Sequence, residues 1–425
     1  MTYNISKYGA VGDGATVNTQ AIQAAIDACA QAGGGRVTVT GGAYVTGTIF
    51  LKNRVHLEIA PGAELRGSAN IADYAAGCGK NMYRGEPQMD HCLIFADGAE
   101  GIGISGGGTI NGNGAAFPNP DDADRNRPMM IRFRDCTNLR LRDVTLRDPA
   151  AWTSAWLYCT DIVVDGITIH SRVNANGDGL DFDGCRDVRV ANCAFDTSDD
   201  SICLQTSRPD APCRDVTVTN CLFRSKWAGM RIGLLSRGDI ENICVSNCVF
   251  RDISDAGLKI QMCEGASMQN MTFANLFMQN VPRPVFMTLG QQRCCVDAPP
   301  ELAPPGQLRQ LMFSTLLVDN RNCGPDSQIV LTGIPGALIE DVTLHNVRMT
   351  TRGGGTETDA RRDGVPELVP ETLAGHWPEY RCFGRPLPAS GLYARHVRNL
   401  TCRELNFDTI ENDCRDEIVT EDVVP

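Results

Sequence analysis

Short runs in which apolar and polar residues alternate recur along most of the chain. Each run is rich in Val, Ile and Thr, and no long helical pattern separates one run from the next. Alternation with a period of two is typical of β-strands that have one buried face. The clearest four runs start 26, 28 and 27 residues apart, at residues 161–169, 187–195, 215–223 and 242–250. A repeat of this length with one dominant strand predicts an all-β fold, a right-handed parallel β-helix whose coils bury their apolar faces against each other.

Identical residues recur at the same position of successive repeats. One row of asparagines comprises Asn192, Asn220, Asn247 and Asn275. We interpret it as an internal ladder whose side chains bond from coil to coil and satisfy backbone groups at the turns. Sugar binding or glycosylation is the alternative interpretation.

One helix is predicted, near the start of the chain. Residues 18–29 begin with a polar residue and carry apolar residues at helical spacing, and three glycines follow at 33–35. Such a helix would cover the open end of the solenoid, which otherwise exposes strand edges.

Composition and charge exclude several classes of protein. The formal net charge is −12 without a basic stripe, which argues against a nucleic-acid partner. No apolar run is long enough for a membrane span. The 19 cysteines lack zinc-site spacing and mostly lie between apolar neighbours, so we interpret them as small core residues rather than as disulfides or metal ligands. Residues 1–7 do not resemble a secretory signal, and with many free thiols this leads us to expect a cytoplasmic location. Nothing in the sequence indicates an oligomeric state.

Three aspartates are the strongest candidates for chemistry. Asp178 lies 21 and 22 residues before the adjacent pair Asp199 and Asp200. This separation is close to one repeat, so neighbouring coils of a solenoid can bring the three carboxylates together. Crowded carboxylates share protons unequally, so one can act as a general acid while the others activate water. The alternative is that all three are turn formers. We interpret Asp181 and Asp183, on the following strand, as structural.

Several motifs resemble the polygalacturonase family, glycoside hydrolase family 28. They lie at residues 8–14, 106–114, 127–128 and 149–153. The Asn-x-Asp motif of the family matches Asn176 to Asp178, and its Asp-Asp motif matches Asp199 and Asp200. The resemblance implies an inverting glycosidase without a metal or other cofactor, whose partner is an oligosaccharide or polysaccharide substrate. It also implies that Asp199 is the general acid and that Asp178 and Asp200 hold and deprotonate the attacking water.

Two family motifs are altered in this chain. The histidine of a Gly-His-Gly motif is replaced by Ala228, and an Arg-Ile-Lys motif is replaced by Lys259, Ile260 and Gln261. Only one cation remains there, and it is a lysine rather than the fork-shaped arginine. Strict endo-polygalacturonase activity is therefore not expected. The predicted substrate-binding residues are Asn176, Lys259, Gln261, Arg231 and Trp227.

Two of these ligands have structural alternatives. Arg231 is the candidate for the missing cation, and a salt bridge on the outer face is the alternative. Trp227 is a candidate for stacking on a sugar ring, and packing against the coils is its alternative.

We expect a single domain over residues 1–425. Its parts are an N-terminal cap with the first coils (1–70), central coils with the catalytic cleft (71–350), an inserted loop (351–390), and a last coil with the C-terminal tail (391–425). A loop of this length that closes one end of the cleft would make the enzyme exo-acting, and a packed surface loop is the alternative.

The predicted function is that of an inverting glycoside hydrolase on pectin-derived or related plant-wall oligosaccharides, exo-acting rather than a strict polygalacturonase. A β-helix lyase or fructotransferase stays open, and a lyase would need a base such as Lys259. A non-catalytic carbohydrate-binding β-helix also stays open.

Overall fold

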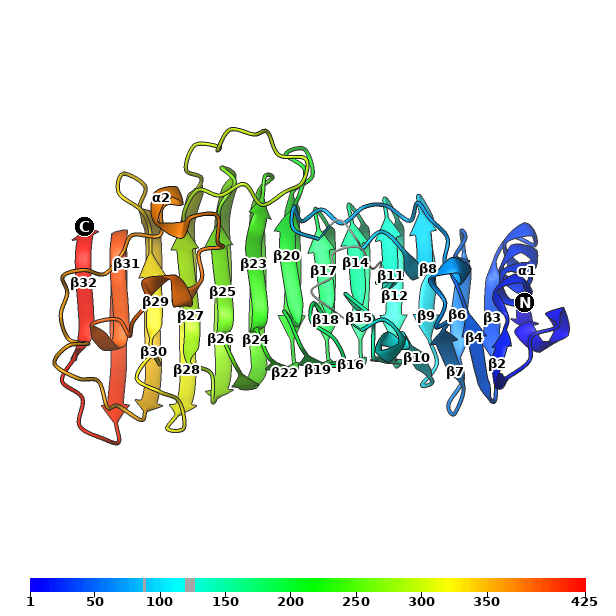
Figure 1. Ribbon diagram of the computed structural model, residues 1–425, viewed down its shortest axis with the longest axis horizontal. Helices are drawn as coiled ribbons and strands as arrows, with labels where there is room; N and C mark the ends of the chain where they lie inside the picture. The colour runs from blue at the N-terminus through cyan, green and yellow to red at the C-terminus, as the bar shows by residue number, and fades with distance from the viewer. Residues whose placement is uncertain (87–88, 119–126) are drawn as a thin grey trace. The chain divides into compact units, whose positions relative to one another are not determined.

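Parallel strands stacked coil upon coil make up the chain (Figure 1). The structure, a computed structural model, describes residues 1–86, 89–118 and 127–425. It contains two compact units, residues 1–202 and 203–425, which are described one at a time. The predicted all-β class and right-handed parallel β-helix are confirmed. The expectation of a single domain stays a prediction.

In the first unit each full coil contributes three short strands, and these form three parallel ladders. One ladder comprises β5 (Ile49–Phe50), β8 (Cys92–Asp97), β11 (Met129–Arg134), β14 (Ser154–Leu157) and β17 (Leu180–Asp183). The second comprises β1 (Thr2–Asn4), β3 (Gly35–Val39), β6 (Val55–Ile59), β9 (Gly103–Ser105), β12 (Thr137–Arg142), β15 (Thr160–Asp165) and β18 (Arg186–Ala191). The third comprises β2 (Asp13–Val17), β4 (Ala43–Thr46), β7 (Glu64–Gly67), β10 (Thr109–Asn111), β13 (Thr145–Arg147), β16 (Thr168–Ser171) and β19 (Ala194–Thr197).

The second unit joins two of these strands into one longer strand per coil. Its short ladder comprises β20 (Ile202–Thr206), β23 (Ala228–Ser236), β25 (Ala256–Met262), β27 (Arg283–Leu289) and β29 (Ile329–Thr332). Its long ladder comprises β21 (Cys213–Thr219), β22 (Leu222–Ser225), β24 (Ile240–Ile253), β26 (Ser267–Gln279), β28 (Gln307–Asn320) and β30 (Ile339–Thr351). The last coils are β31 (Ala389–Thr409) and β32 (Asp416–Val424).

The predicted helix is present as α1 (Thr19–Gln31). Its buried residues are Ile22, Ala25, Ile26 and Cys29, and this face packs on β1 and β3. Among its described residues the first unit also has three short 3-10 helices: η1 (Ile5–Tyr8), η2 (Ile71–Asp73) and η3 (Gly114–Ala116). None of the helices in the described residues has the length and apolar content needed to cross a bilayer.

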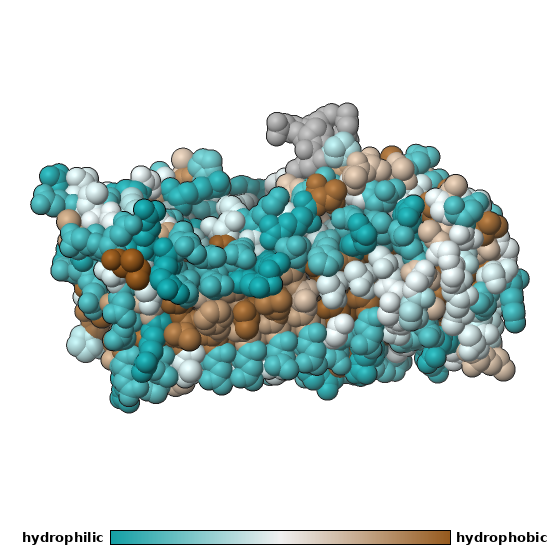
Figure 2. Space-filling view, turned by 90° about the horizontal axis from the view of Figure 1, so that it is seen from below, coloured by the Kyte–Doolittle hydropathy of each residue, from teal (hydrophilic) through white to brown (hydrophobic). Residues whose placement is uncertain are grey.

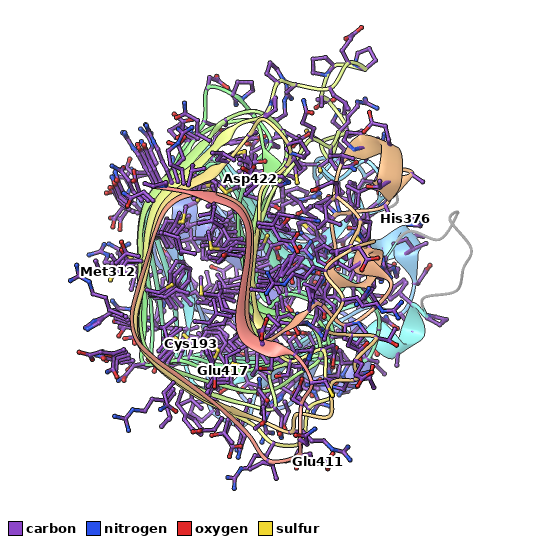
Figure 3. All side chains as sticks on the ribbon, turned by 90° about the vertical axis from the view of Figure 1, so that its left-hand side faces the viewer. Cys193, Met312, His376, Glu411, Glu417 and Asp422 are labelled. Carbon is purple, nitrogen blue, oxygen red and sulfur yellow. The ribbon has the colours of Figure 1, made fainter. Side chains whose placement is uncertain are left out.

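The apolar positions of the alternating pattern form rows of side chains inside each unit. Figure 3 looks along the coils and shows side chains filling their interior, whereas Met312 points outward. In the second unit the Phe223 and Phe250 rings are stacked with centroids 4.5 Å apart, and the Phe273 and Phe313 rings with centroids 4.8 Å apart. The face shown in Figure 2 is mostly polar, with a band of apolar side chains.

The predicted asparagine ladder lies at a corner of the coil rather than in its interior. The row members have positive φ values of 56–58°, and Asn275 donates to the side-chain oxygen of Asn247 over 3.2 Å. Asn192, Asn247 and Asn275 are exposed. Asparagine tolerates the left-handed conformation that the corner requires, so the corner accounts for the repeat. All nineteen cysteines are free thiols in the structure, and most of them are buried.

The segment between β30 and β31 is packed onto the second unit. It contains α2 (Pro370–Leu373) and η4 (Tyr380–Phe383). Its apolar residues join a buried cluster with the coil residues Phe286, Val330 and Tyr393. The residues that the segment contributes to this cluster are Val365, Leu368, Leu373, Tyr380, Phe383 and Leu387. We call residues 352–388 the inserted segment.

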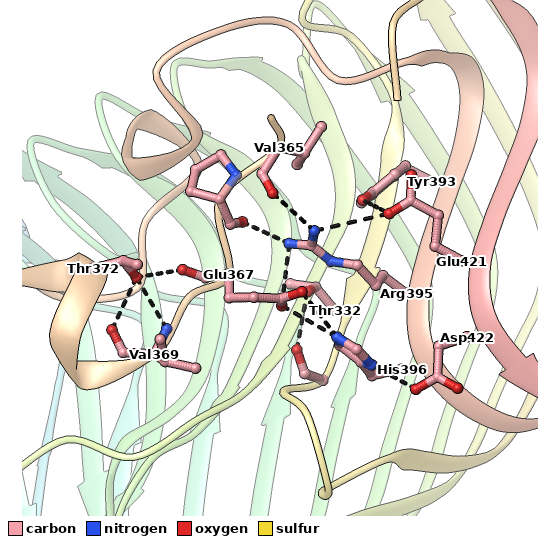
Figure 4. Close-up of polar contacts among 12 residues, drawn as sticks. Thr332, Val365, Glu367, Val369, Thr372, Tyr393, Arg395, His396, Glu421 and Asp422 are labelled. Atoms are coloured by element: carbon pink, nitrogen blue, oxygen red, sulfur yellow. Dashed lines mark hydrogen bonds and ion pairs between the residues drawn. The ribbon is translucent and has the colours of Figure 1, made fainter. Parts of the chain in front are cut away.

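Strand β31 holds residues 365–367 of the inserted segment by polar contacts (Figure 4). Arg395 donates to the carbonyl oxygens of Val365 over 3.1 Å and of Pro366 over 2.6 Å. One ring nitrogen of His396 lies 3.1 Å from Oε1 of Glu367. Buried apolar contacts and these bonds together fix the inserted segment in one place.

Candidate active site

Three carboxylates come together on neighbouring coils of the first unit. One oxygen each of Asp178, Asp199 and Asp200 lies within 4.8 Å of the other two. Asp178 stands two residues before β17, and the Asp199–Asp200 pair follows the end of β19. The structure therefore places the three aspartates as the repeat spacing predicts, and their catalytic role stays a prediction.

The close approach of the backbone explains the two glycines that flank Asp178. A Cβ added to either Gly177 or Gly179 would lie 2.2 Å from a backbone carbonyl oxygen, so only glycine fits. The backbone N–H of Gly179 donates to the carbonyl oxygen of Asp200 over 2.9 Å. These glycines thus bring the segment of Asp178 into direct contact with that of the aspartate pair.

The three aspartates differ in how far they are buried. Asp178 and Asp200 are 6% and 2% exposed, whereas Asp199 is partly exposed. Burial raises the pKa of Asp178 well above its usual value, and the negative charges of Asp199, Asp181, Asp200 and Glu86 raise it further. Neighbouring carboxylates titrate as a group, so the trio retains a proton at a pH where an isolated aspartate is ionised. A shared proton beside ionised carboxylates supports acid–base chemistry at one centre.

Replacement of Asp178 by asparagine should stabilise the fold increasingly as pH rises. The folded-state pKa of Asp178 is raised, so the unfolded chain loses this proton first and stability falls as pH rises through the folded pKa. Asparagine has no such proton to lose. The gain in Tm over wild type should therefore be small near about pH 4 and grow toward about pH 8. Thermal unfolding across this range measures it, with Asp187→Asn, an exposed residue of β18, as the control. A gain that does not change with pH would contradict the raised pKa.

A polar cluster holds the loop that carries Asp178. Arg127 donates to Oδ1 of Asn176 over 2.8 Å, and Nδ2 of Asn176 donates to Oε1 of Glu86 over 3.1 Å. Burial lowers the pKa of Arg127, while the charges of Glu86 and Asp178 oppose this. The amide of Asn176, a predicted substrate ligand, is thus bonded within the chain at both ends.

Neither Glu86 nor Arg127 is predicted as a site residue from the sequence. Arg127 belongs to a motif that carries the family resemblance, and that signal could have identified it. Glu86 stands 90 residues before Asn176 in a loop without a motif, so the sequence offers no signal for it.

The other four predicted ligands lie in the second unit, next to the inserted segment. Arg231 of β23 and Lys259 of β25 are register partners. Lys259 is fully buried, and its Nζ donates to Oδ2 of Asp255 over 2.6 Å and to a carboxylate oxygen of Glu379. Arg231 Nη2 lies 3.6 Å from the other oxygen of Glu379. The ion pair offered as the alternative for Arg231 is present, but it is buried rather than on the outer face.

Gln261 and Trp227 also contact the inserted segment or its partners. Nε2 of Gln261 donates to the carbonyl oxygen of Pro378 over 2.9 Å. The Nζ of Lys259 lies 4.5 Å from the ring centroid of Trp227. The carboxylate of Glu379, in the inserted segment, therefore pairs with Lys259 and Arg231, the two cations predicted to bind substrate. The substrate-binding role of these residues stays a prediction.

The aspartate trio is the one cluster of metal-ligand type found within the described ranges. Carboxylate oxygens at this spacing are ligands that a hard divalent cation accepts. The family resemblance implies a reaction without a metal, and no step below depends on one.

The fold and the trio define a class: a right-handed parallel β-helix with a buried carboxylate centre. Residues 76–359 match the family described as glycosyl hydrolases family 28, and the chain belongs to this family. It is 28% identical over 337 residues to an exo-poly-alpha-D-galacturonosidase from Dickeya chrysanthemi, covering 66% of this chain and 55% of that protein. It is 26% identical over 299 residues to a probable polygalacturonase from Arabidopsis thaliana, covering 67% of this chain and 60% of that protein.

Solved structures share the fold. A family 28 exopolygalacturonase from Yersinia enterocolitica superposes with a TM-score of 0.76 at 23% identity, covering 100% of this chain and 77% of that chain. The chain spans less than two thirds of the length of the first curated relatives it matches.

Proposed function

We propose that this protein is an inverting, exo-acting glycoside hydrolase of pectin-derived or related plant-wall oligosaccharides. The observation that carries the proposal is the trio of Asp178, Asp199 and Asp200, whose carboxylate oxygens lie within 4.8 Å of one another in a largely buried centre. Membership of family 28 and the exo-acting relative from Dickeya chrysanthemi support the class of reaction. The proposed cytoplasmic location rests on the free thiols alone.

In the proposed mechanism Asp199 protonates the leaving oxygen, because it is the member of the trio that reaches the surface. In the reactive state the proton that the trio shares lies on Asp199, so Asp178 and Asp200 are both ionised. These two carboxylates hold a water between them and remove its proton as it attacks the anomeric carbon. A water that accepts or donates hydrogen bonds of about 2.7–2.8 Å on each side fits between oxygens at this spacing. The water attacks directly, so the anomeric configuration of the product is inverted.

The inserted segment supports a changed substrate preference. Glu379 neutralises Lys259 and Arg231, so these cations already have a carboxylate partner. A polygalacturonan chain would have to compete with that carboxylate. We therefore propose weak activity on polygalacturonic acid and higher activity on short oligosaccharides with a different sugar at the cleavage site.

A panel of pectic and plant-wall oligosaccharides, including polygalacturonate, tests the function. We expect kcat/KM to be highest on a short rhamnogalacturonan-derived or neutral oligosaccharide. Proton NMR of the first-formed product should show the inverted anomer. A product that absorbs in the ultraviolet would favour the lyase, and no turnover on any substrate would favour a non-catalytic β-helix.

Retention is the second mechanism that a specific observation favours. Retaining glycosidases hold their two carboxyl groups only about 5–5.5 Å apart, which is close to the oxygen spacing of this trio. A retained anomer would therefore make one aspartate a nucleophile and overturn the direct attack by water.

A further inference from the structure

The stretch between η2 and β8 brings a carboxylate to the loop that carries Asp178. The backbone N–H of Glu86 donates to the carbonyl oxygen of Tyr83 over 3.2 Å, so Glu86 ends a turn. Its Oε2 accepts a hydrogen bond from Nδ2 of Asn81 over 3.0 Å. Asn81 and Tyr83 are buried, and the Tyr83 ring meets the Trp152 ring edge-on at a centroid distance of 5.7 Å. These contacts give the Glu86 carboxylate a fixed place in the first unit.

The other oxygen of the Glu86 carboxylate holds the amide of Asn176. Nδ2 of Asn176 donates to Oε1 of Glu86 over 3.1 Å, and Nη2 of Arg127 donates to Oδ1 of Asn176 over 2.8 Å. A guanidinium can only donate hydrogen bonds, and an ionised carboxylate can only accept them. The amide of Asn176 therefore fits between Arg127 and Glu86 in a single orientation.

The orientation of Asn176 is passed on to Asp178 by the short backbone between them. Asn176 adopts the left-handed conformation, with φ at 52°, and Gly177 is the one residue that separates it from Asp178. The N–H of Gly177 donates to Oγ of Ser198 over 3.0 Å, next to the aspartate pair. A displacement of about 1 Å in an active site can cost about 10²-fold in rate. A change in how the Asn176 amide is held would thus reach the carboxylate of Asp178.

Other hydrogen bonds hold the backbone of this loop independently of Glu86. Nδ2 of Asn174 donates to the carbonyl oxygens of Gly114 and Phe117, over 2.9 Å in each case. Loss of the Glu86 carboxylate would therefore leave the fold intact and loosen the loop only at Asn176.

We propose that Glu86 is a positioning residue for the proposed reaction: through the amide of Asn176 it holds Asp178 in the orientation that removes the proton of the attacking water. The proposal rests on the proposed function, in which Asp178 and Asp200 activate that water. Glu86 is not itself an acid or base of this reaction. The alternative is that Glu86 only ties its own loop through Asn81, in which case hydrolysis does not depend on its bond to Asn176.

Steady-state kinetics of Glu86→Ala on the best oligosaccharide of the panel test the proposal. We expect kcat to fall by at least about tenfold and KM to change by less than about threefold, because the lost contact serves the chemical step rather than binding. In an Asn176→Gly background the same substitution should change kcat by less than about threefold, because residues that act through one contact are not additive. Glycine adopts the φ of residue 176 without strain, so this background removes only the amide.

A second measurement needs no substrate. Hydrogen–deuterium exchange should be at least about threefold faster in Glu86→Ala for peptides that cover residues 176–178, because a local contact is lost. The Tm should fall by no more than about 4 °C, since the contacts of the loop backbone remain. Glu100→Ala, at an exposed position of the first unit, is the matched control and should keep both wild-type exchange and wild-type kcat.

An equal loss of kcat with and without the Asn176 amide would overturn the proposal, because Glu86 would then act by another route. A loss of kcat together with a larger fall in Tm would make Glu86 a residue of the fold and would also overturn it. Faster exchange at residues 176–178, in a protein whose wild type hydrolyses no member of the panel, would refute the proposed function alone. Hydrolysis that Glu86→Ala leaves unchanged would refute the positioning role alone.

Discussion

Asp199→Asn is expected to lower kcat by a factor of about 10² or more, because a positioned general acid typically contributes about 10²–10⁴-fold. Asp199 is the partly exposed member of the trio, so an isosteric amide in its place leaves the fold and most substrate contacts intact. The loss should therefore appear in kcat and kcat/KM alike, with KM nearly unchanged. Initial rates on the best oligosaccharide of the panel measure it.

Asp187→Asn is the matched control for this variant. It makes the same chemical change at an exposed position of the first unit, on β18, and should keep wild-type activity. If Asp199→Asn is nearly as active as wild type, Asp199 is not the acid, and the proton that the trio retains serves another member.

The fold follows from the repeat because each coil makes the same contacts as the coil before it. Val188 pairs with Ile162 and Phe195 with Ile169, so one alternating run predicts the environment of the next. The run at 161–169 is nevertheless two strands, β15 and β16, because Gly166 turns the chain at φ 67°. Periodicity alone does not reveal such a corner, since burial alternates on both sides of it.

The sequence predicts only those parts of the candidate site that follow the coil repeat. The spacing of 21 and 22 residues places the aspartate trio, because the coil length converts sequence separation into proximity. Contacts that loops provide follow no period. Glu379 meets Lys259 across 120 residues, and no pattern in either segment identifies the partner. The sequence therefore gives no sign that Lys259 and Arg231 have a partner in the inserted segment, whereas the structure shows both beside the buried carboxylate of Glu379.

Glu379→Ala is expected to destabilise the protein by about 3–5 kcal/mol, the typical cost of removing one partner from a buried ion pair. Glu379 is 1% exposed and Lys259 is fully buried, so the lysine charge would be left with Asp255 alone. Arg231, 6% exposed, would lose the same carboxylate. Desolvated charges without partners cost more than the hydrogen bonds themselves contribute. The fall in the denaturation midpoint at an unchanged slope measures this loss.

Two further variants separate the ion pair from the mere presence of the inserted segment. Glu371→Ala, at an exposed position of α2 in the same segment, should change stability by no more than about 0.5 kcal/mol. Replacement of both partners, Lys259→Met with Glu379→Leu, should recover much of the loss, because an apolar pair leaves no unpaired charge between these two positions. If Glu379→Ala is as stable as wild type, water reaches Lys259 and the inserted segment does not seal it. If the double variant is no better than Glu379→Ala, the packing of residues 377–380, rather than the ion pair, holds the segment on β25.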